Sequence, residues 1–369
     1  MTSRQCALAP CLRLFMCSMA AGGASADRAT SVAVEVQATP LQTLSTATFS
    51  EGGYLAWSGP VLCDGDGNVY FLLVPTGQDA KDGPPAATSV VPRDVLRVSA
   101  DGKKRVSFSP VASPKFASAA ELTTIALGLD RNAALFMLVW ARWRDNGDQA
   151  EQSGQYMLSF DQKGEYRSSV EIDWKDMLVH QFEVFGSGEF LLRGRGTHTA
   201  EQRLVILSAG GKLRDVEGWP GNFLDEPSPG SAPKFDHMVR GGDGRIYVTQ
   251  EDVPKGGDVV YAISASGESE RVFKLPRMRK NPKLMGWKAA GRYFAATYLD
   301  AARRLRDSSG EERGRWWVSV FSDVTDGAEP EATVYGPAPG PLLCYEHKGS
   351  RDRFIFVMDG AKLVTMSAR

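Results

Sequence analysis

The chain has 369 residues with 43 Lys and Arg against 44 Asp and Glu, so its formal net charge is −1 at pH 7. This near-zero net charge excludes a strong overall electrostatic field that would attract nucleic acid or an anionic membrane. The 43% hydrophobic and 24% charged residues exclude wholesale disorder, and 38 Gly with 20 Pro indicate a folded chain with many turns.

The N-terminal segment, residues 1–26, is typical of an export signal. Two arginines precede an apolar stretch at 14–21, and residues 24–26 offer a small-residue cleavage pattern. A lipid anchor at Cys17 is the alternative, but the residue before it is not small. We therefore expect a mature chain, 27–369, that is periplasmic or extracellular, with no stretch of the about 18 apolar residues that a transmembrane helix needs.

Two kinds of alternating segment then follow one another along the chain, and each is typical of a β-hairpin. The first kind is an apolar run, a tight turn and a second apolar run, at 61–73, 125–140, 182–192, 237–249, 286–298 and 342–358. The second kind has a turn usually built on Gly, at 94–109, 155–172, 203–219, 259–275 and 316–335. One pair recurs about every 57 residues, which predicts six four-stranded units.

The sixth unit lacks one strand, because residues 362–369 supply a single strand before the chain stops. The segment 31–37 alternates in the same way as the outer strands, so we expect it to fill the missing place. Pairing the two ends closes the ring and leaves no open sheet edge at the junction. The prediction is an all-β, six-bladed β-propeller, closed by an N-terminal strand that pairs with the C-terminal blade.

The turns at 66–67, 101–102 and 243–244 each combine Asp with Gly. With the repeat, this pattern resembles six-bladed β-propellers of the TolB-like, NHL-repeat and gluconolactonase-like kind. The resemblance covers essentially the whole mature chain and implies a single domain over 27–369. Blades two and six have Arg131-Asn132 and Arg351-Asp352 where a glycine turn is expected. A pair of β-sandwiches is the alternative fold.

Each propeller blade runs outward from its inner strand a to its outer strand d, so that the d–a and b–c connections share one face. Long connections of this class fall at 74–91, 111–122, 142–153, 219–234, 276–285 and 300–314. Function often lies on unusually long connections carried by a rigid scaffold. We predict a binding module that receives a protein or a small, anionic extracellular ligand on this long-loop face.

Histidines and aspartates near the inner strands are candidate site residues. His180 and His237 precede the turns of blades three and four, Asp64 and Asp236 lie at similar levels, and His347 lies in blade six. Three imidazoles around one channel could bind a metal or polarise a ligand. Separate, hydrogen-bonded histidines are the alternative, and we expect no cofactor.

The resemblance to gluconolactonases implies a second function. In that reading the protein is a metal-dependent hydrolase whose Ca or Zn lies in the channel, with Asp64, His180, Asp236 and His237 as its ligands. The ligand pattern of that family cannot be matched residue by residue here. We therefore expect a binding module rather than an enzyme, and keep the lactonase-like hydrolase as the alternative.

The segment 274–292 carries seven Lys and Arg residues and no acid. Its guanidinium groups could pair with a carboxylate or phosphate, and an indole could offer a stacking surface. We predict ligand binding by Arg277, Arg279, Lys280 and Trp287. A solvated charged loop is the alternative.

Cys63 and Cys344 follow nearly identical sequences, Gly-Pro-Val-Leu and Gly-Pro-Leu-Leu. If blades one and six adjoin, an oxidising compartment permits a disulfide between them, and two buried thiols are the alternative. The segment 64–68 begins like a calcium loop but lacks the glycine and the glutamate that the loop requires later. We expect it to be a turn.

Overall fold

Tight turns of one repeated geometry fold the alternating segments into hairpins. In the first turn the Gly67 N–H donates to the Asp64 carbonyl oxygen at 3.1 Å, and the Asp64 carboxylate accepts the N–H groups of Asp66 and Asn68, each at 3.0 Å. Gly67 has a left-handed φ of 78°, which glycine adopts easily because it has no Cβ. An aspartate that satisfies two amides and a glycine that takes the left-handed step therefore specify this hairpin.

The turn of blade two uses the same device without a glycine. The Asp130 carboxylate accepts the N–H groups of Asn132 and Ala134, each at 2.8 Å, and Ala133 takes the left-handed position with φ 57°. That conformation costs an alanine about 1 kcal/mol, and the two hydrogen bonds offset the cost. The hairpin predicted around 131–132 is therefore present.

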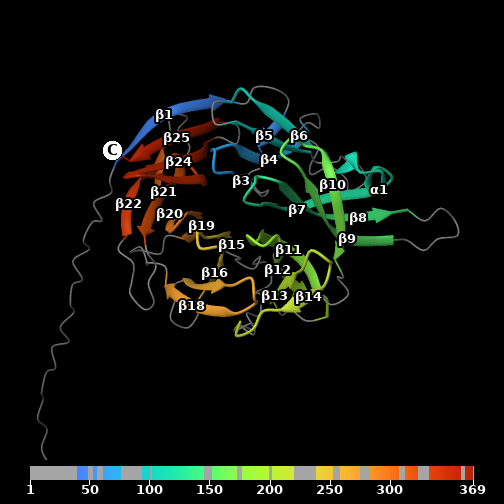
Figure 1. The fold of residues 1–369 in the computed structure, drawn as a ribbon. Coiled ribbons are helices and arrows are strands. Elements are labelled where there is room, and N and C mark those ends of the chain that lie inside the picture. The colour runs from blue at the N-terminus through green and yellow to red at the C-terminus, as the bar shows by residue number, and fades with distance from the viewer. Residues whose placement is uncertain are drawn as a thin grey trace, which may run out of the picture. The chain divides into compact units, whose positions relative to one another are not determined.

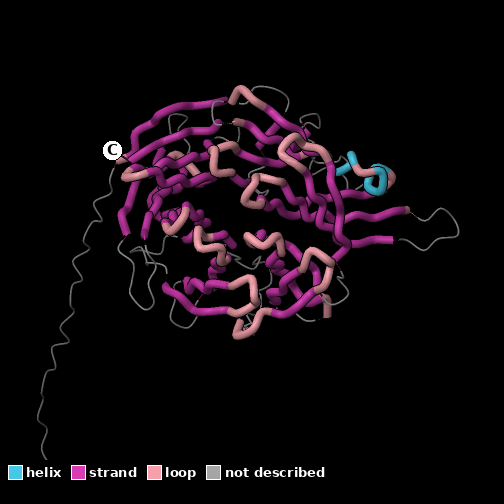
Figure 2. The backbone as a smooth tube through the Cα atoms, viewed as in Figure 1, coloured by secondary structure: helices cyan, strands magenta, loops and turns pink. Residues whose placement is uncertain are grey.

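The computed structural model describes residues 40–48, 53–55, 61–75, 94–99, 102–144, 152–172, 177–198, 202–219, 238–251, 258–274, 283–306, 312–322, 332–358 and 362–368. Strands dominate this part of the chain, and its helices are the short η1 (Pro110–Ala112) and α1 (Pro114–Ala117) between blades one and two (Figure 2).

The strands form six sheets, one for each blade (Figure 1). Blades one to three contain β2 (Gly53–Leu55), β3 (Val61–Cys63), β4 (Val69–Pro75), β5 (Val95–Val98) and β6 (Arg105–Phe108); β7 (Glu121–Leu129), β8 (Leu135–Trp143), β9 (Gln152–Phe160) and β10 (Tyr166–Ile172); and β11 (Met177–Val184), β12 (Phe190–Gly196), β13 (Gln202–Leu207) and β14 (Leu213–Asp215). Blades four to six contain β15 (Met238–Arg240), β16 (Ile246–Glu251), β17 (Asp258–Ile263) and β18 (Ser269–Lys274); β19 (Lys283–Ala290), β20 (Tyr293–Arg306), β21 (Glu312–Ser322) and β22 (Ala332–Ala338); and β23 (Leu342–Lys348), β24 (Arg351–Met358), β25 (Lys362–Ala368) and β1 (Leu41–Thr48).

The blades form a closed ring around their inner strands. Each strand pairs antiparallel with the next from the inside outward, and β2 and β3 share the inner position of blade one by pairing with different parts of β4. The inner strands contact one another in the order β3, β7, β11, β15, β19 and β23, and β23 contacts β3 again (Figure 1). The six-bladed propeller prediction is confirmed.

An N-terminal strand closes the ring, as predicted, but a different segment supplies it. β1 pairs antiparallel with β25, from Leu41 opposite Ala368 to Thr48 opposite Lys362. The segment 31–37 lies outside the described residues, and the outer position of blade six is occupied by β1. Residues 31–37 alternate, whereas the apolar residues of β1 recur every three positions, at Leu41, Leu44 and Ala47, and its pairing has an irregularity between Thr43 and Ser45. Its threonines favour a strand. Alternation therefore pointed to the neighbouring segment.

The turn of blade six also differs from the prediction. It lies at Gly349-Ser350, with φ 66° at Gly349, rather than at Arg351-Asp352. Two-residue hairpin turns need left-handed residues, which is why a glycine occupies this one. Asp352 consequently lies inside β24.

The predicted long connection at 300–314 is largely strand. β20 and β21 continue to pair as far as Arg306 opposite Glu312, with an irregularity between Asp300 and Arg304. Of the other long connections, 111–122 contains η1 and α1, and most of 74–91, 142–153, 219–234 and 276–285 lies outside the described residues.

Apolar side chains fill the spaces between blades. Each pair of neighbouring blades encloses one cluster of buried residues. Phe108 of blade one meets Phe160 of blade two edge to face, with ring centroids 6.1 Å apart, and Phe136 meets Phe190 in the same way between blades two and three. Each such buried side chain contributes about 1.5–3 kcal/mol. The interfaces between blades therefore hold the ring together and fix the positions of the inner strands.

Candidate functional site

A cavity of about 600 Å³ lies at the end of the channel where the inner strands reach their a–b turns. We call it the turn-end cavity. All six blades line it, with one contribution from each in Asp64, Leu129, Glu183, Arg240, Lys288 and Glu346. It lies at the opposite end of the channel from the long-loop face, because a–b turns and b–c connections occupy opposite faces of a blade.

Three consecutive blades place charges in the turn-end cavity. Arg240 of blade four donates from Nη1 to the carbonyl oxygens of Leu129 at 3.1 Å and Val184 at 3.2 Å, so its guanidinium ties blades two, three and four together. Glu183 and Lys288 interact electrostatically. Within the described residues, however, no ion pair of 4.0 Å or less joins them. The two opposite charges face one cavity without touching.

The surroundings disfavour both of these charges. Burial raises the pKa of the Glu183 carboxyl, against the opposing effects of the Val184 N–H and of the charges on Arg240 and Lys288. Burial also lowers the pKa of the Lys288 ammonium, against the effect of Glu183. Desolvation acts in this direction on an acid and on a base alike. The cavity therefore leaves each group short of a partner for its charge.

A buried polar cluster lies behind the blade-six wall of the cavity, to which it contributes Tyr345 and His347. Asp352, which is 8% exposed, accepts hydrogen bonds from the hydroxyls of Tyr335 at 2.7 Å and Tyr345 at 2.8 Å, and His347 Nδ1 lies 2.9 Å from its Oδ1. Burial and the Asp352 carboxylate raise the pKa of both tyrosines. Tyr293 stacks on the His347 ring at 3.5 Å between centroids. Asp352 thus fixes the orientation of His347 at the cavity wall.

Glu346 adds a carboxylate to the same wall. It is 7% exposed and lines the turn-end cavity, and its Oε2 lies 3.3 Å from Arg353 Nη1 and 3.5 Å from Lys348 Nζ. Its Oε1 is buried and accepts no hydrogen bond from any residue that the structure describes. A buried acceptor without a donor is costly, and such groups in native proteins call for an explanation.

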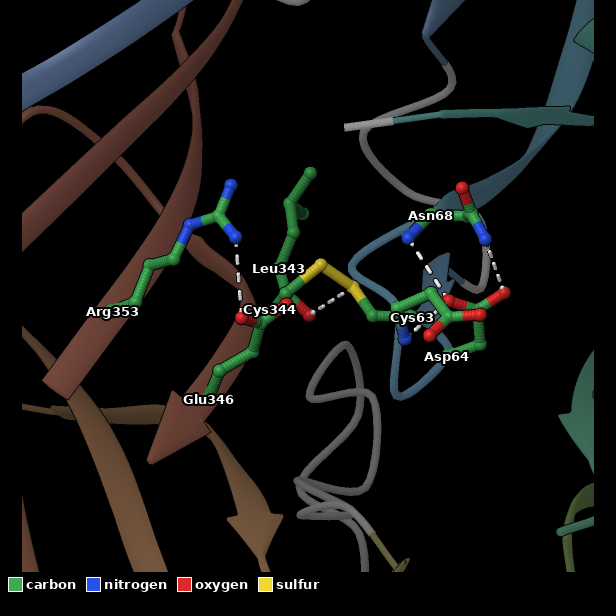
Figure 3. Close-up of a disulfide and its surroundings, with 8 residues drawn as sticks. Cys63, Asp64, Asn68, Leu343, Cys344, Glu346 and Arg353 are labelled. Carbon is green, nitrogen blue, oxygen red and sulfur yellow. Dashed lines mark hydrogen bonds and ion pairs between the residues drawn. A yellow bond between two sulfur atoms is a disulfide. The ribbon is translucent and has the colours of Figure 1, made fainter. Parts of the chain in front are cut away.

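Next to Glu346 a disulfide joins Cys63 of β3 to Cys344 of β23 (Figure 3). Their Cα atoms are 5.6 Å apart, and the Leu343 carbonyl oxygen lies 3.3 Å from the Cys63 sulfur. The bond connects the inner strand of blade six to an inner strand of blade one. Of the two alternatives that the sequence left open for these cysteines, the structure contains the disulfide.

Of the predicted site residues Asp64 and His180, the first lines the turn-end cavity and the second does not. Asp64 lines the turn-end cavity, but its carboxylate already accepts hydrogen bonds from its own turn and from the Tyr70 hydroxyl at 3.1 Å. His180 lies in β11 and is not among the residues that line this cavity. Burial, together with the nearby charge of Arg193, lowers the pKa of His180 to about 4.

Trp287, predicted to offer a stacking surface, is fully buried between blades four and five. Its indole packs against Phe294 and Tyr247, with ring centroids at 5.3 and 6.3 Å, so no face of it lines the surface. Its strand neighbour Lys288 instead faces the cavity. The other predicted site residues lie outside the described part of the chain: Asp236, His237, Arg277, Arg279 and Lys280.

A metal site cannot be assembled from the described residues, because no group of three or more His, Cys, Asp or Glu side chains among them is close enough to hold an ion. Two of the four metal ligands of the hydrolase alternative lie outside those residues, so that alternative stays a prediction. In the same part of the chain, no helix is long and apolar enough to cross a membrane.

The sequence analysis missed the cavity residues Glu183, Arg240, Tyr345 and Glu346. It predicted His347 but not the Asp352 carboxylate beside it. The alternation of side chains along a strand could have indicated one cavity residue, Lys288. Residues of a strand point alternately to opposite faces, so Trp287 in the core implies that Lys288 points the other way. No local pattern shows that Tyr335 and Asp352 meet, because they lie on different blades.

No family model matches the sequence, and no curated protein matches it either. Several solved structures share its architecture. A Hadza microbial sialidase aligns with 86% of this chain and 66% of its own, at a TM-score of 0.51 and 9% identity, so the chain spans about two thirds of that protein's length.

Two further similar structures are a gluconolactonase from Xanthomonas campestris and the calcium-binding protein regucalcin from Agrobacterium tumefaciens. The gluconolactonase has a TM-score of 0.44 and 11% identity, over 89% of this chain and 98% of its own. Regucalcin has a TM-score of 0.45 and 10% identity, over 90% and 94%. At these identities the likeness concerns the propeller fold alone.

Proposed function

We propose that this protein is an exported ligand-binding propeller and that its turn-end cavity binds a small organic molecule bearing a carboxylate. The observation that carries the proposal is Lys288, a partly buried lysine that faces the cavity. Within the described residues its ammonium has no hydrogen-bond or ion-pair partner. A carboxylate ligand would supply the missing partner.

The size and lining of the cavity support this proposal. Its volume of about 600 Å³ lies within the range of small-molecule sites. Arg240, Arg292 and Lys348 line it together with Lys288, so four cationic side chains face the space that an anion would occupy. Leu62 and Met238 add apolar wall, which suits the carbon skeleton of an organic acid.

Export is supported by the disulfide between Cys63 and Cys344, because such bonds persist mainly in oxidising compartments. Binding at the long-loop face is a separate prediction, since most of that face lies outside the described residues.

Calorimetric titration with 3-phenylpropionate tests the proposal. We expect Lys288→Met, which keeps the length of the side chain but removes its charge, to weaken binding about tenfold or more, because a charge-assisted hydrogen bond is lost. The matched control is Lys212→Met, at an exposed lysine in the turn after β13. It should bind like the unmodified protein. Equal affinity in the Lys288 variant would overturn the proposal, and so would the absence of binding by 3-phenylpropionate and by every related compound that carries a carboxylate.

A further inference from the structure

We infer that the ligand of the turn-end cavity is a small zwitterion, carrying an ammonium group as well as a carboxylate, so that free amino acids are its chemical class. The inference rests on the proposed function and adds a second recognised group. It follows from the way in which acidic and basic side chains share this one cavity.

Glu183 and Lys288 are opposite charges that face the same space with a gap between them. Had they formed an ion pair, each would have satisfied the other. The charge of Arg240 acts on Glu183 more strongly than that of Lys288, but Arg240 donates its Nη1 to two main-chain carbonyls, and no ion pair of 4.0 Å or less joins it to Glu183 within the described residues. A ligand that carries both charges can pair with each group at once.

Glu346 provides a second acceptor on the blade-six side. Its Oε2 is paired with Arg353 and Lys348, whereas its buried Oε1 accepts nothing from the described residues. Glu183 and Glu346 lie in blades three and six, on opposite sides of the ring. They therefore offer the ammonium group of a ligand two alternative acceptors in one cavity.

A simple anion fits the same cavity less well. Its carboxylate would pair with Lys288 but would share the cavity with the like charges of Glu183 and Glu346, which repel it. A simple amine would meet the corresponding repulsion from Lys288, Arg240 and Arg292. Only a molecule with both groups avoids both penalties.

Four probes with one skeleton separate these cases: phenylalanine, 3-phenyllactate, 3-phenylpropionate and phenethylamine. They share the aromatic ring and differ in whether they carry the ammonium group, a hydroxyl in its place, the carboxylate alone or the amine alone. Calorimetric titration of the full-length protein measures all four, with both enantiomers of phenylalanine and phenyllactate. We expect one enantiomer of phenylalanine to bind about tenfold more tightly than the other three compounds.

Two substitutions locate the ammonium site. Glu183→Gln or Glu346→Gln should reduce the preference for phenylalanine over 3-phenylpropionate by about tenfold while leaving 3-phenylpropionate bound at least as tightly as before, and the variant that does so identifies the acceptor. Glu189→Gln, in the turn of blade three and outside the cavity lining, is the matched control and should keep the preference. Thermal unfolding of each variant shows whether it is folded, and either cavity variant alone suffices for the test.

The possible failures are distinguishable. If none of the probes that carry a carboxylate binds, the proposed function fails together with this inference. If 3-phenylpropionate or 3-phenyllactate binds as tightly as phenylalanine, the carboxylate site stands and the ammonium site is refuted. A preference that survives in both cavity variants also refutes the assignment to these glutamates.

Discussion

The two interfaces of blade six are built in different ways. Toward blade one, the Cys63–Cys344 disulfide crosses a cluster of apolar residues that includes Val69 and Phe71. Toward blade five, Asp352 and the tyrosine hydroxyls sit inside an otherwise apolar cluster. The first interface joins the two ends of the ring and is secured covalently. The second is secured by hydrogen bonds and places His347 at the wall of the turn-end cavity.

The two interfaces therefore have different roles: one closes the ring and the other shapes its channel. A covalent bond between distant parts of the chain reduces the number of conformations of the unfolded state, and it does so without hydrogen bonds from the residues around it. A buried carboxylate needs every one of its partners, and these partners fix the side chains around it. The interface between blades five and six therefore sets the geometry of the cavity wall, and the interface between blades six and one sets the stability of the ring.

Breaking the disulfide should have the largest effect on stability. It closes a loop of 281 residues, so reduction of the folded protein should lower the free energy of unfolding by about 4 kcal/mol. Urea denaturation of oxidised and reduced protein measures the difference, and a thiol assay verifies reduction. An unchanged midpoint in fully reduced protein would contradict the role assigned to this interface.

Removing the carboxylate at the other interface should cost nearly as much. Asp352→Ala leaves the hydroxyls of Tyr335 and Tyr345 buried without an acceptor, which should lower the free energy of unfolding by about 3 kcal/mol. Asp215→Ala is the control, because that carboxylate is exposed and its pairing with Arg203 is worth little. Similar losses of unfolding free energy in the two variants would show that the buried cluster does not stabilise the protein more than an exposed ion pair does.

Acid adds a third effect to the comparison, because His180, which lies at neither interface of blade six, has a lowered pKa. The pKa of His180 is about 4 in the folded protein and 6.5 in the reference state, so below pH 6.5 the unfolded chain binds a proton that the folded chain excludes. Stability from this group is present above pH 6.5 and is lost as the pH falls toward 4.

Compared with His180→Gln, the unmodified protein should therefore lose about 2 kcal/mol more between pH 7 and pH 4, as measured by urea denaturation across that range. His198→Gln, at an exposed histidine, should follow the unmodified protein. Parallel pH profiles for the His180 variant and the unmodified protein would refute this assignment.

The fold was predictable because it depends on local patterns repeated six times. Asp and Gly in the turns and alternation in the strands specify each hairpin, and the repeat specifies the ring. The prediction was less accurate for the closing strand and for the turn of blade six, where neighbouring segments competed for the same place. The closing strand is Leu41–Thr48, and the last turn uses Gly349 rather than Arg351-Asp352.

The candidate site was much less predictable, because its parts come from different blades. Cys63 and Cys344 stood out because their contexts match. The gap between Glu183 and Lys288, and the meeting of Tyr335 with Asp352, depend on how neighbouring blades are rotated about the channel. No spacing along the chain encodes those distances. For Trp287 the sequence analysis predicted a ligand contact, because the residue lies in the basic segment 274–292. Its ring is buried in the core instead, as the alternation of side chains along a strand allows.

A crystal structure of the protein with phenylalanine bound is the most direct test of the proposed site. It should show the amino acid in the turn-end cavity, with its carboxylate within hydrogen-bond distance of Lys288 Nζ and its ammonium group toward Glu183 or Glu346. An empty turn-end cavity, with phenylalanine bound only at the long-loop face, would contradict it.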